Sequence, residues 1–196
     1  MVDFPRSYDP TYLAQLPPMI IPIAGSELTP RDLQMPGAPR HYRLGIHEGT
    51  DLYWQPGTVV RAIADGQIIR ANHDYQPATP ALVSYWRAET LLQGYTPEEA
   101  LDFYRGMQVW IEHENGFITR YGHLSQISPE IVVGAAVVQG QAVGTVGNSG
   151  SPMSLDSDLA DAHLHFELWL QDNFVGQYMR PIEIRGWIER LMLQEE

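Results

Sequence analysis

The stretch Asp161-Ala-His-Leu-His-Phe-Glu-Leu-Trp-Leu170 contains two histidines one residue apart. Its period of two predicts a β-strand with His163, His165 and Glu167 on one face and apolar residues packed inward on the other. Two imidazoles that point the same way from a strand suit a metal ion, because imidazole is the commonest protein ligand for zinc. One such pair cannot complete a site, so a further ligand must come from elsewhere in the chain.

Composition limits both the chemistry and the partners. The 196 residues suffice for one domain with a full core, and the chain has no cysteine, so only histidine and carboxylate remain as transition-metal ligands. A formal charge of -12 argues against nucleic acid and anionic membrane surfaces as main partners. No apolar run is long enough to span a bilayer, and residues 1–6 do not open a secretory leader. We therefore expect either a protein that stays inside the cell or a chain from which a leader or anchor was removed.

Proline divides the chain into two parts. Residues 1–40 hold eight of the fifteen prolines, which excludes a regular helix and a long inner strand there. We interpret this part as an extended N-terminal arm whose apolar segment, residues 19–23, packs against the domain formed by residues 41–196. The arm is more readily explained by packing than by binding.

A second pair of ligand types lies at His47 and Asp51. A spacing of four residues places two side chains together on a helix, and an even spacing does so on a strand. The zinc motif H-E-x-x-H begins at His47-Glu48, but Asp51 occupies the position of its second histidine, and Gly45 and Gly49 disfavour the helix that it requires. We set that motif aside. By itself, the pair is a weak signal.

Short strands with turn residues between them predict an all-β chain. Asp65-Gly66 lies between the runs 58–64 and 67–71 and predicts a hairpin, because both turn positions favour positive φ. Further strands are expected over residues 131–138 and 142–146.

Asn115-Gly116 predicts a second hairpin within residues 107–123. A two-residue turn would pair Glu114 with Phe117, which places Thr119 and Tyr121 on one face with His123, and His113 on the other. His123 ends its strand at a corner, where a side chain is commonly directed at a site. His113 is interpreted as a packing or surface histidine.

Residues 76–106 interrupt the strands with a predicted helical hairpin. Thr79-Pro80 begins one helix and Gly94 ends it, while Thr96-Pro97-Glu98-Glu99 forms a capping box for a second helix that ends at Gly106. We favour a cover for a sheet edge over a substrate lid or a partner-docking element. Residues 184–193 predict a short amphipathic C-terminal helix.

Four segments together resemble a known family. They are His47-x-x-x-Asp51, Tyr121-Gly122-His123-Leu124-Ser125, Gly147-Asn148-Ser149-Gly150 and His163-Leu164-His165-Phe166-Glu167. In this order they resemble the lysostaphin-type zinc endopeptidases, the LytM-like peptidoglycan hydrolases, over roughly residues 45–185. The resemblance implies an all-β fold, a mostly antiparallel β-sandwich with the site in a groove, here carrying the inserted helical hairpin.

The same resemblance implies the site residues and the substrate. His47, Asp51 and His165 would bind Zn2+, and His123 and His163 would be the catalytic pair. The substrate would be peptidoglycan peptides, and the location extracytoplasmic, in the periplasm or cell wall or outside the cell. Family members commonly approach the His-x-His strand through a short segment, whereas residues 151–162 are longer and acidic here, a departure near the substrate.

The chemistry of these residues is consistent with hydrolysis. Two imidazoles and one carboxylate leave a fourth zinc position for water, whose pKa the metal lowers. His123 and His163 could move protons and steady a developing oxyanion; His163 could instead only orient His165. The function expected is therefore that of a monomeric zinc metalloendopeptidase. The alternative is a non-catalytic cell-wall regulator or amidase activator with a structural zinc site.

Overall fold

The described residues form three antiparallel sheets: a two-stranded sheet of β1 and β2, and two larger sheets that share one core. The computed structural model describes residues 16, 19–157, 159–170, 172–177 and 179–192. A seven-stranded sheet has the strand order β12-β11-β7-β6-β5-β9, with β3 also paired to β11, and a three-stranded sheet has the order β4-β10-β8. Every pairing between these strands is antiparallel, which confirms the predicted fold class.

The elements have the following bounds. The strands are β1 (Pro39–Arg40), β2 (Gly45–Ile46), β3 (Thr50–Tyr53), β4 (Val59–Arg61), β5 (Gly66–Ala71), β6 (Val109–His113), β7 (Phe117–Gly122), β8 (Leu124–Ile127), β9 (Ala136–Val137), β10 (Ala142–Val146), β11 (His163–Leu170) and β12 (Asn173–Phe174). The helices are α2 (Pro80–Gln93), α3 (Glu98–Arg105) and α4 (Pro181–Met192), and the short 3-10 helices are η1 (Asp32–Gln34), η2 (His41–Arg43), η3 (Glu114–Gly116) and η4 (Pro152–Leu155).

The predicted strand around the two histidines is β11, and it lies inside the large sheet. It pairs with β7 along one edge and with β3 and β12 along the other. Leu164 and Phe166 point into the core and are 0% and 5% exposed, respectively. The opposite face, with His163, His165 and Glu167, is also buried, so any site on it lies beneath other parts of the chain.

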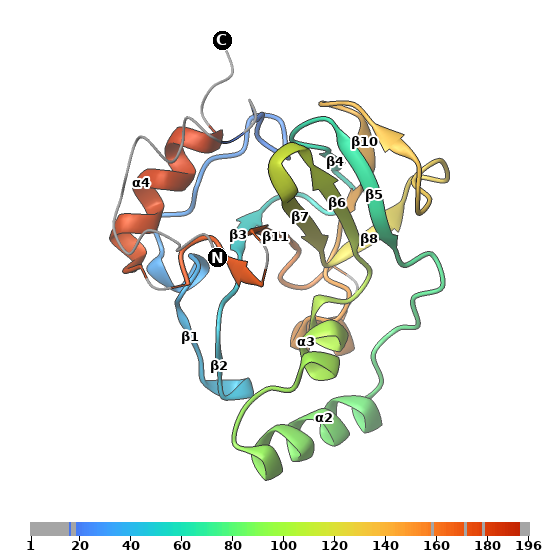
Figure 1. Cartoon of the computed structure of the whole chain (residues 1–196). Coiled ribbons are helices and arrows are strands. Elements are labelled where there is room, and N and C mark those ends of the chain that lie inside the picture. The colour runs from blue at the N-terminus through green and yellow to red at the C-terminus, as the bar shows by residue number, and fades with distance from the viewer. Residues whose placement is uncertain (1–15, 17–18, 158, 171, 178, 193–196) are drawn as a thin grey trace.

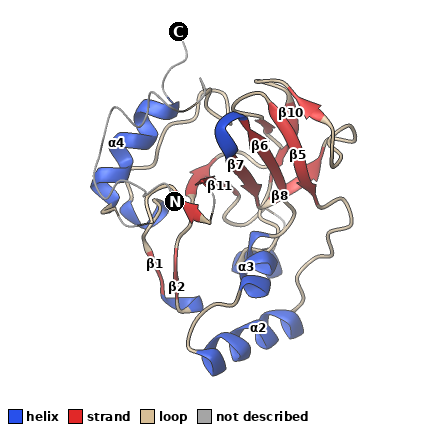
Figure 2. Ribbon diagram, viewed as in Figure 1, coloured by secondary structure: helices blue, strands red, loops and turns tan. Residues whose placement is uncertain are grey.

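The two sheets pack face to face through apolar side chains. Val60 and Val143 of the small sheet belong to the same buried cluster as Ile68, Ile111 and Leu164 of the large sheet. Figure 2 shows the strands gathered together and the helices at the periphery. Burial of apolar area between the sheets is the main contribution that fixes β11 and its neighbours.

The predicted hairpin at Asp65-Gly66 is wrong. β4, before the turn, pairs with β10, whereas β5, after it, pairs with β6 and β9, so the turn carries the chain from the small sheet to the large one. Gly66 is needed for close approach rather than for positive φ, since a Cβ there would lie 2.5 Å from Glu112 O. Both strands still bury their apolar residues between the sheets. The apolar pattern is therefore compatible with a turn that crosses between sheets as well as with a hairpin.

The second predicted hairpin forms, but its turn is one residue longer than predicted. The three-residue η3 joins β6 to β7, and Ile111 pairs with Thr119. The predicted pairing of Glu114 with Phe117 is therefore wrong. The one-residue shift moves Thr119 and Tyr121 onto the buried face that carries His113, whose Nε2 lies 2.7 Å from Thr119 Oγ1. His113 is thus a packing histidine.

The helical hairpin inserted before β6 is present as predicted. α2 begins after Thr79, whose Oγ1 accepts a hydrogen bond from Leu82 N, and ends at Gly94, where φ is 78°. α3 ends at Gly106, as expected. The capping box is wrong, however, because Pro97 is the N-cap of α3.

The hydroxyl of Thr96 has a different partner. It donates to the backbone carbonyl of Arg43 in η2 and so ties the start of α3 to the N-terminal part of the fold. Figure 1 places α2 and α3 beyond one end of the large sheet. Because α3 leads directly into β6, it stands at the ends of the strands and not along a sheet edge, in contrast to the edge cover expected from the sequence.

The terminal segments pack on the large sheet as expected where the structure describes them. Met19, Ile21 and Ile23 are buried, and Ile20 N donates to Ile63 O at 2.9 Å. Residues 1–15, 17 and 18 of the proline-rich arm lie outside the described residues. α4 buries Ile184, Trp187 and Ile188 and confirms the C-terminal amphipathic helix. Of the described helices, none combines the length and apolar character needed to cross a bilayer.

Candidate active site

Pairing between β3 and β11 brings Asp51 directly opposite His165. The segment before β3 carries His47, and Gly49 allows it to approach β11, since a Cβ at that position would lie 2.5 Å from Phe166 O. The backbone of His47 is held on both sides, with its N–H donating to Ala38 O at 2.7 Å and its carbonyl accepting from Gly37 N at 2.8 Å. A strand register and a glycine contact therefore bring together residues that are 118 positions apart.

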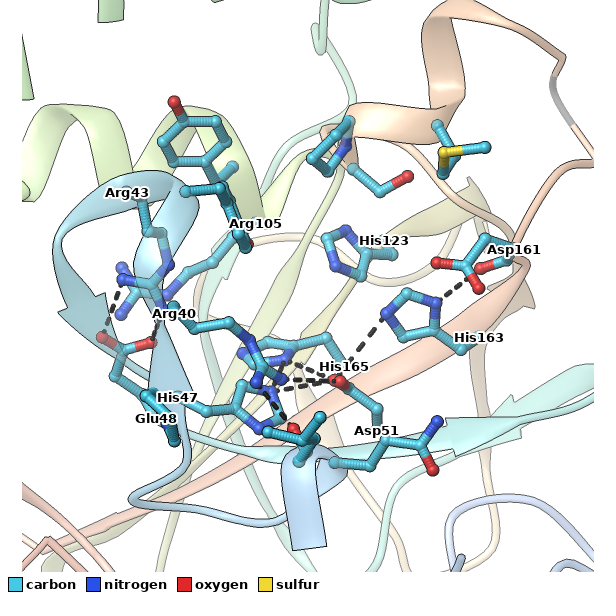
Figure 3. Close-up of a pocket in the computed structure, with 18 of the residues that line it drawn as sticks. Arg40, Arg43, His47, Glu48, Asp51, Arg105, His123, Asp161, His163 and His165 are labelled. Atoms are coloured by element: carbon cyan, nitrogen blue, oxygen red, sulfur yellow. Dashed lines mark hydrogen bonds and ion pairs between the residues drawn. The ribbon is translucent and has the colours of Figure 1, made fainter. Parts of the chain in front are cut away.

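His47, Asp51 and His165 meet at three ligand atoms. His47 Nε2 lies 2.9 Å from Asp51 Oδ1 and 3.0 Å from His165 Nδ1, and His165 Nδ1 lies 3.0 Å from Asp51 Oδ1. These atoms form a nearly equilateral triangle, and all three side chains are buried. Figure 3 shows them converging at the floor of a groove.

The other ring nitrogens fix the tautomers of these two histidines. His47 Nδ1 donates to the carbonyl of Met35 at 3.1 Å, and His165 Nε2 donates to Glu167 Oε1 at 2.8 Å. In the neutral rings, the nitrogens that face Asp51 therefore carry lone pairs. Three electron-pair donors within 3 Å of one another require a shared cation, and this set of two imidazoles and one carboxylate suits zinc.

The spacing of the three donors also suits zinc. Tetrahedral ligands at about 2.0–2.1 Å from the metal are separated by roughly 3.3 Å, only slightly more than the separations found here. The carboxylate of Glu167 beside His165 Nε2 is the arrangement that commonly orients a metal-bound imidazole. These residues therefore fit a zinc ion.

The charges of the cluster agree with this requirement for a cation. Burial raises the pKa of Asp51, but His47, His163 and His165 outweigh it, so that the pKa is well below the usual value. Burial lowers the pKa of His47. For His165, hydrogen bonds to Asp51 and Glu167 overcome burial and raise the pKa to about 9. The positive charge can thus be a proton on His165 or a metal that replaces this proton.

His123 and His163 stand beside the metal-binding cluster with one nitrogen each engaged. His123 Nδ1 donates to Ser149 O, and His163 Nδ1 donates to Asp161 O, both at 2.6 Å. Their ring centroids are 4.7 Å apart, and His163 Nε2 is 3.7 Å from Asp51 Oδ1. Neither Nε2 takes part in these two hydrogen bonds, and His163 Nε2 lies within ion-pair distance of Asp51, so both atoms could exchange protons within the groove.

The backbone of His123 is unusual. Its φ is 58°, a left-handed conformation that a non-glycine residue rarely adopts and that occurs often at functional sites. A hydrogen bond from His123 N to Arg105 O, 2.8 Å long, supports it. Burial, then the neighbouring His163 and His165, lower the pKa of His123 well below its usual value, so the ring is neutral at physiological pH.

The groove above these residues has a volume of about 600 Å³. Residues 31–43 form one wall, α3 forms another with Leu101, Tyr104 and Arg105, and η4 contributes Pro152 and Met153. Figure 3 shows His123 and His163 on the side opposite Arg43 and Glu48. The five predicted site residues therefore line one groove.

Several residues of the site were not predicted. Arg40 Nη2 binds the second oxygen of Asp51 at 3.0 Å, Tyr53 stacks on His163 with ring centroids 4.8 Å apart, and Arg105 contacts Glu167. Of these residues, only Glu167 could have been linked to the site from the sequence, because it shares a strand face with His165. Arg40 and Arg105 reach the site through tertiary packing, which residue spacing does not reveal.

A second group of possible ligands, Glu48, His165 and Glu167, is less suited to a metal. Arg43 Nη2 lies 2.6 Å from Glu48 Oε2, and Arg105 Nε lies 2.7 Å from Glu167 Oε1. Both carboxylates are already neutralised by buried guanidinium groups. Their role is to hold neighbouring side chains in place.

The chain belongs to peptidase family M23, whose family model matches residues 45–177. The matched region contains the triangle of ligand atoms and both additional histidines. It also contains the helical insertion.

Two curated proteins are similar to part of the chain. The chain is 30% identical over 127 residues to the peptidoglycan DD-endopeptidase ShyA of Vibrio cholerae serotype O1, covering 64% of this chain and 21% of that protein. It is 25% identical over 142 residues to the peptidoglycan DD-endopeptidase ShyC of the same organism, covering 72% and 24%. The chain thus spans about a quarter or less of the length of these relatives.

Among structures, the catalytic domain of lysostaphin from Staphylococcus simulans is 19% identical, with a TM-score of 0.47 and coverage of 91% of this chain and 98% of that one. A zinc-containing peptidase from Vibrio cholerae is 22% identical, with a TM-score of 0.45 and coverage of 90% and 40%.

Proposed function

We propose that this protein is a zinc-dependent endopeptidase that hydrolyses peptide cross-links of bacterial peptidoglycan. The metal ligands are His47, Asp51 and His165, and the catalytic pair is His123 and His163. The catalytic domain comprises residues 41–196, with residues 1–40 as an arm. The observation that carries the proposal is the convergence of three electron-pair donors in a groove that two further histidines also line.

The metal and the two further histidines would have different roles in hydrolysis. Zinc, when bound, supplies Lewis-acid activation of water and of the peptide carbonyl. His163 Nε2, near Asp51, and neutral His123 Nε2 carry lone pairs and are placed to accept a proton from the attacking water. Once protonated, His123 Nε2 can hydrogen-bond the developing oxyanion or pass its proton to the leaving amine. The hydrogen bonds at Nδ1 keep both rings in the tautomer that this requires.

The substrate class is supported by the family and by the relatives. ShyA and ShyC are both described as peptidoglycan DD-endopeptidases, and the five site residues line a groove of about 600 Å³. This substrate implies that the protein acts outside the cytoplasm. We propose a monomer.

The alternative function is a non-catalytic regulator or amidase activator that holds zinc structurally. Purified protein is incubated with cell-wall fragments, and new amino groups are quantified with and without a chelator. Release that stops with chelator, and with His123→Ala at full zinc occupancy, supports the endopeptidase. Intact fragments at full zinc occupancy of the unaltered chain would support the regulator instead.

A second arm of the experiment addresses the bond cleaved. Glycine-rich and D-amino-acid cross-link peptides are compared at equal concentration, with products identified by mass spectrometry. The similarity to DD-endopeptidases leads us to expect cleavage of the D-amino-acid peptide. Preferential cleavage of the glycine-rich peptide would overturn this choice of substrate but would leave the hydrolytic activity in place.

A further inference from the structure

Arg105, the last residue of α3, contacts both parts of the candidate active site. Its carbonyl accepts the backbone N–H of His123 at 2.8 Å, and its Nε donates to Glu167 Oε1 at 2.7 Å. The side chain is only 4% exposed although it comes from an inserted helix. Arg105, which belongs to the insertion, therefore hydrogen-bonds both the backbone of His123 and the carboxylate of Glu167.

The side-chain contact leads directly to His165. Glu167 Oε1 accepts hydrogen bonds from both Arg105 Nε and His165 Nε2, the latter at 2.8 Å. Glu167 is fully buried, and its other oxygen is 3.4 Å from Arg120 Nη1. This second oxygen, Oε2, also accepts a hydrogen bond from Trp169 Nε1. Because Oε1 serves both Arg105 and His165, the guanidinium group of Arg105 helps to hold the acceptor for His165 in place.

The main-chain contacts hold Arg105 in place. After it, Gly106 has a φ of 69°, and a Cβ there would lie 2.2 Å from Ser149 O. Met107 N donates to Ser149 Oγ at 2.9 Å, and Ser149 O accepts His123 Nδ1. The end of α3 is thus fitted against the segment that fixes the tautomer of His123, which leaves little freedom for Arg105 to move.

We infer that Arg105 is a positioning residue, which holds Glu167 so that His165 presents Nδ1 to the metal, and that the helical insertion is in this way a structural part of the metal site. The inference rests on the proposed metal site but is independent of which bond the protein cleaves. Arginine suits the position because its planar guanidinium group can hydrogen-bond two carboxylates at once. Its Nε donates to Glu167, and its Nη1 donates to Glu98 at 2.9 Å.

A second ion pair between α3 and the large sheet provides the matched control. Arg70 Nη1 in β5 lies 2.6 Å from Asp102 Oδ1 in α3, and these side chains are 28% and 37% exposed. Neither residue lines the groove. If Arg105 only attached the insertion to the sheet, removing either arginine would affect the metal site in the same way.

The experiment compares the full chain with the variants Arg105→Gln, Arg105→Lys, Arg70→Gln and Arg70→Lys. Zinc affinity is measured by competition with a chromophoric chelator, and the electronic absorption of the Co2+-loaded protein reports the geometry of the ligands. Circular dichroism establishes that each variant is folded. None of these readouts requires cleavage of a substrate, so failure of the endopeptidase assay and failure of this inference are distinguishable.

We expect Arg105→Gln to lower zinc affinity about tenfold and to shift the Co2+ bands, as loss of outer support for a metal-binding imidazole does. Arg105→Lys keeps the charge without the planar fork and should recover part of the affinity, to within about threefold of the unaltered chain. Both Arg70 variants should match the unaltered chain. A folded Arg105→Gln with unchanged affinity and unchanged Co2+ bands would overturn the inference.

If Arg105→Gln does not fold, the comparison of Arg105→Lys with Arg70→Lys tests the positioning role. A loss of about threefold for Arg105→Lys, with shifted Co2+ bands and no change for Arg70→Lys, supports the positioning role. Equal affinities and spectra for the two lysine variants would show that Arg105 acts only as a structural contact.

Discussion

The two histidine pairs of the groove differ in how many of their ring nitrogens are engaged. His47 and His165 use both nitrogens, one to hold the ring in place and one to face Asp51. His123 and His163 use Nδ1 alone, with backbone carbonyls as acceptors. The comparison teaches that identical side chains in one groove differ in the partners of their ring nitrogens. We propose that the two imidazoles within 3 Å of the Asp51 carboxylate bind the metal and that Nε2 of the other two transfers protons.

Asp51→Ala should have the largest effect, because Asp51 contacts both histidines of the first pair. Structural zinc sites contribute about 10–16 kcal/mol in total, so loss of one of three protein ligands should weaken binding by roughly 10²–10³-fold and stop hydrolysis. Metal content after dialysis and release of amino groups from wall fragments measure the two effects. Asp102→Ala, on α3 and away from the groove, serves as the control. Stoichiometric zinc in Asp51→Ala would refute the assignment of this ligand.

His123→Ala should show most clearly that the two histidine pairs differ in function, because it should affect hydrolysis but not zinc binding. The side chain supplies no ligand atom to the triangle, so zinc content should be unchanged. Loss of a group that transfers a proton or stabilises the oxyanion should lower the rate of hydrolysis by about 10²–10⁴-fold. The exposed His73→Ala is the control for loss of an imidazole. Loss of zinc together with activity would show that the two pairs are not functionally distinct.

Zinc binding should depend on pH through His165 and not through His47. The neighbouring carboxylates raise the pKa of His165 to about 9, so below this pH the ring must release a proton before Nδ1 can bind zinc. Burial lowers the pKa of His47, which is already neutral and releases none. Apparent affinity should therefore fall about tenfold for each pH unit below 9.

Calorimetric zinc titrations at pH 7 in buffers of different ionisation enthalpy test this dependence. About one proton should be released for each zinc bound. Binding without proton release would contradict the expected charge on His165.

His113, outside the groove, should show the smallest effect. Burial lowers its pKa, although its hydrogen bond to Asp65 O opposes this. The unfolded chain therefore takes up a proton first as the pH falls below 6.5, and the folded state loses stability until the pH reaches the lowered pKa. Within this window the loss is about 1.4 kcal/mol per pH unit.

Thermal unfolding at pH 7.5 and 5.5 measures the contribution of His113. The Tm of the unaltered chain should decrease more between these two values than the Tm of His113→Gln. His73→Gln controls for loss of an exposed imidazole. An identical decrease in the unaltered chain and in His113→Gln would exclude this contribution.

Local sequence patterns predicted the elements more accurately than their pairing. Thr79 and Gly94 bound α2 as expected, because caps act within a few residues. The turn residues Asp65-Gly66 did not specify which strand each neighbour would pair with, since a turn between two apolar runs is compatible with a hairpin and with a crossing between sheets. At Asn115-Gly116, one additional turn residue changed the face of every residue in β7.

The candidate site was predictable as far as its residue types and spacing extend. Spacing alone made His47 and Asp51 a weak signal, and the resemblance to a known family implied that they join His165; the structure brings the three together, and their roles stay a proposal. Arg40 and Arg105 were not predicted, because an ion pair between distant elements has no periodic signal. Thr96 was assigned to a helix cap and instead bonds Arg43, a choice that depends on which acceptor lies nearest in space.

The sequence by itself determined which residues could bind a metal and which segments would become strands and helices. These properties depend on side-chain chemistry and on interactions between near neighbours. Only the tertiary structure decided which ring nitrogens face Asp51, which carboxylates are neutralised by arginine, and which helix walls the groove. Those properties depend on distances between residues that are far apart in the chain, and burial between the two sheets fixes these distances.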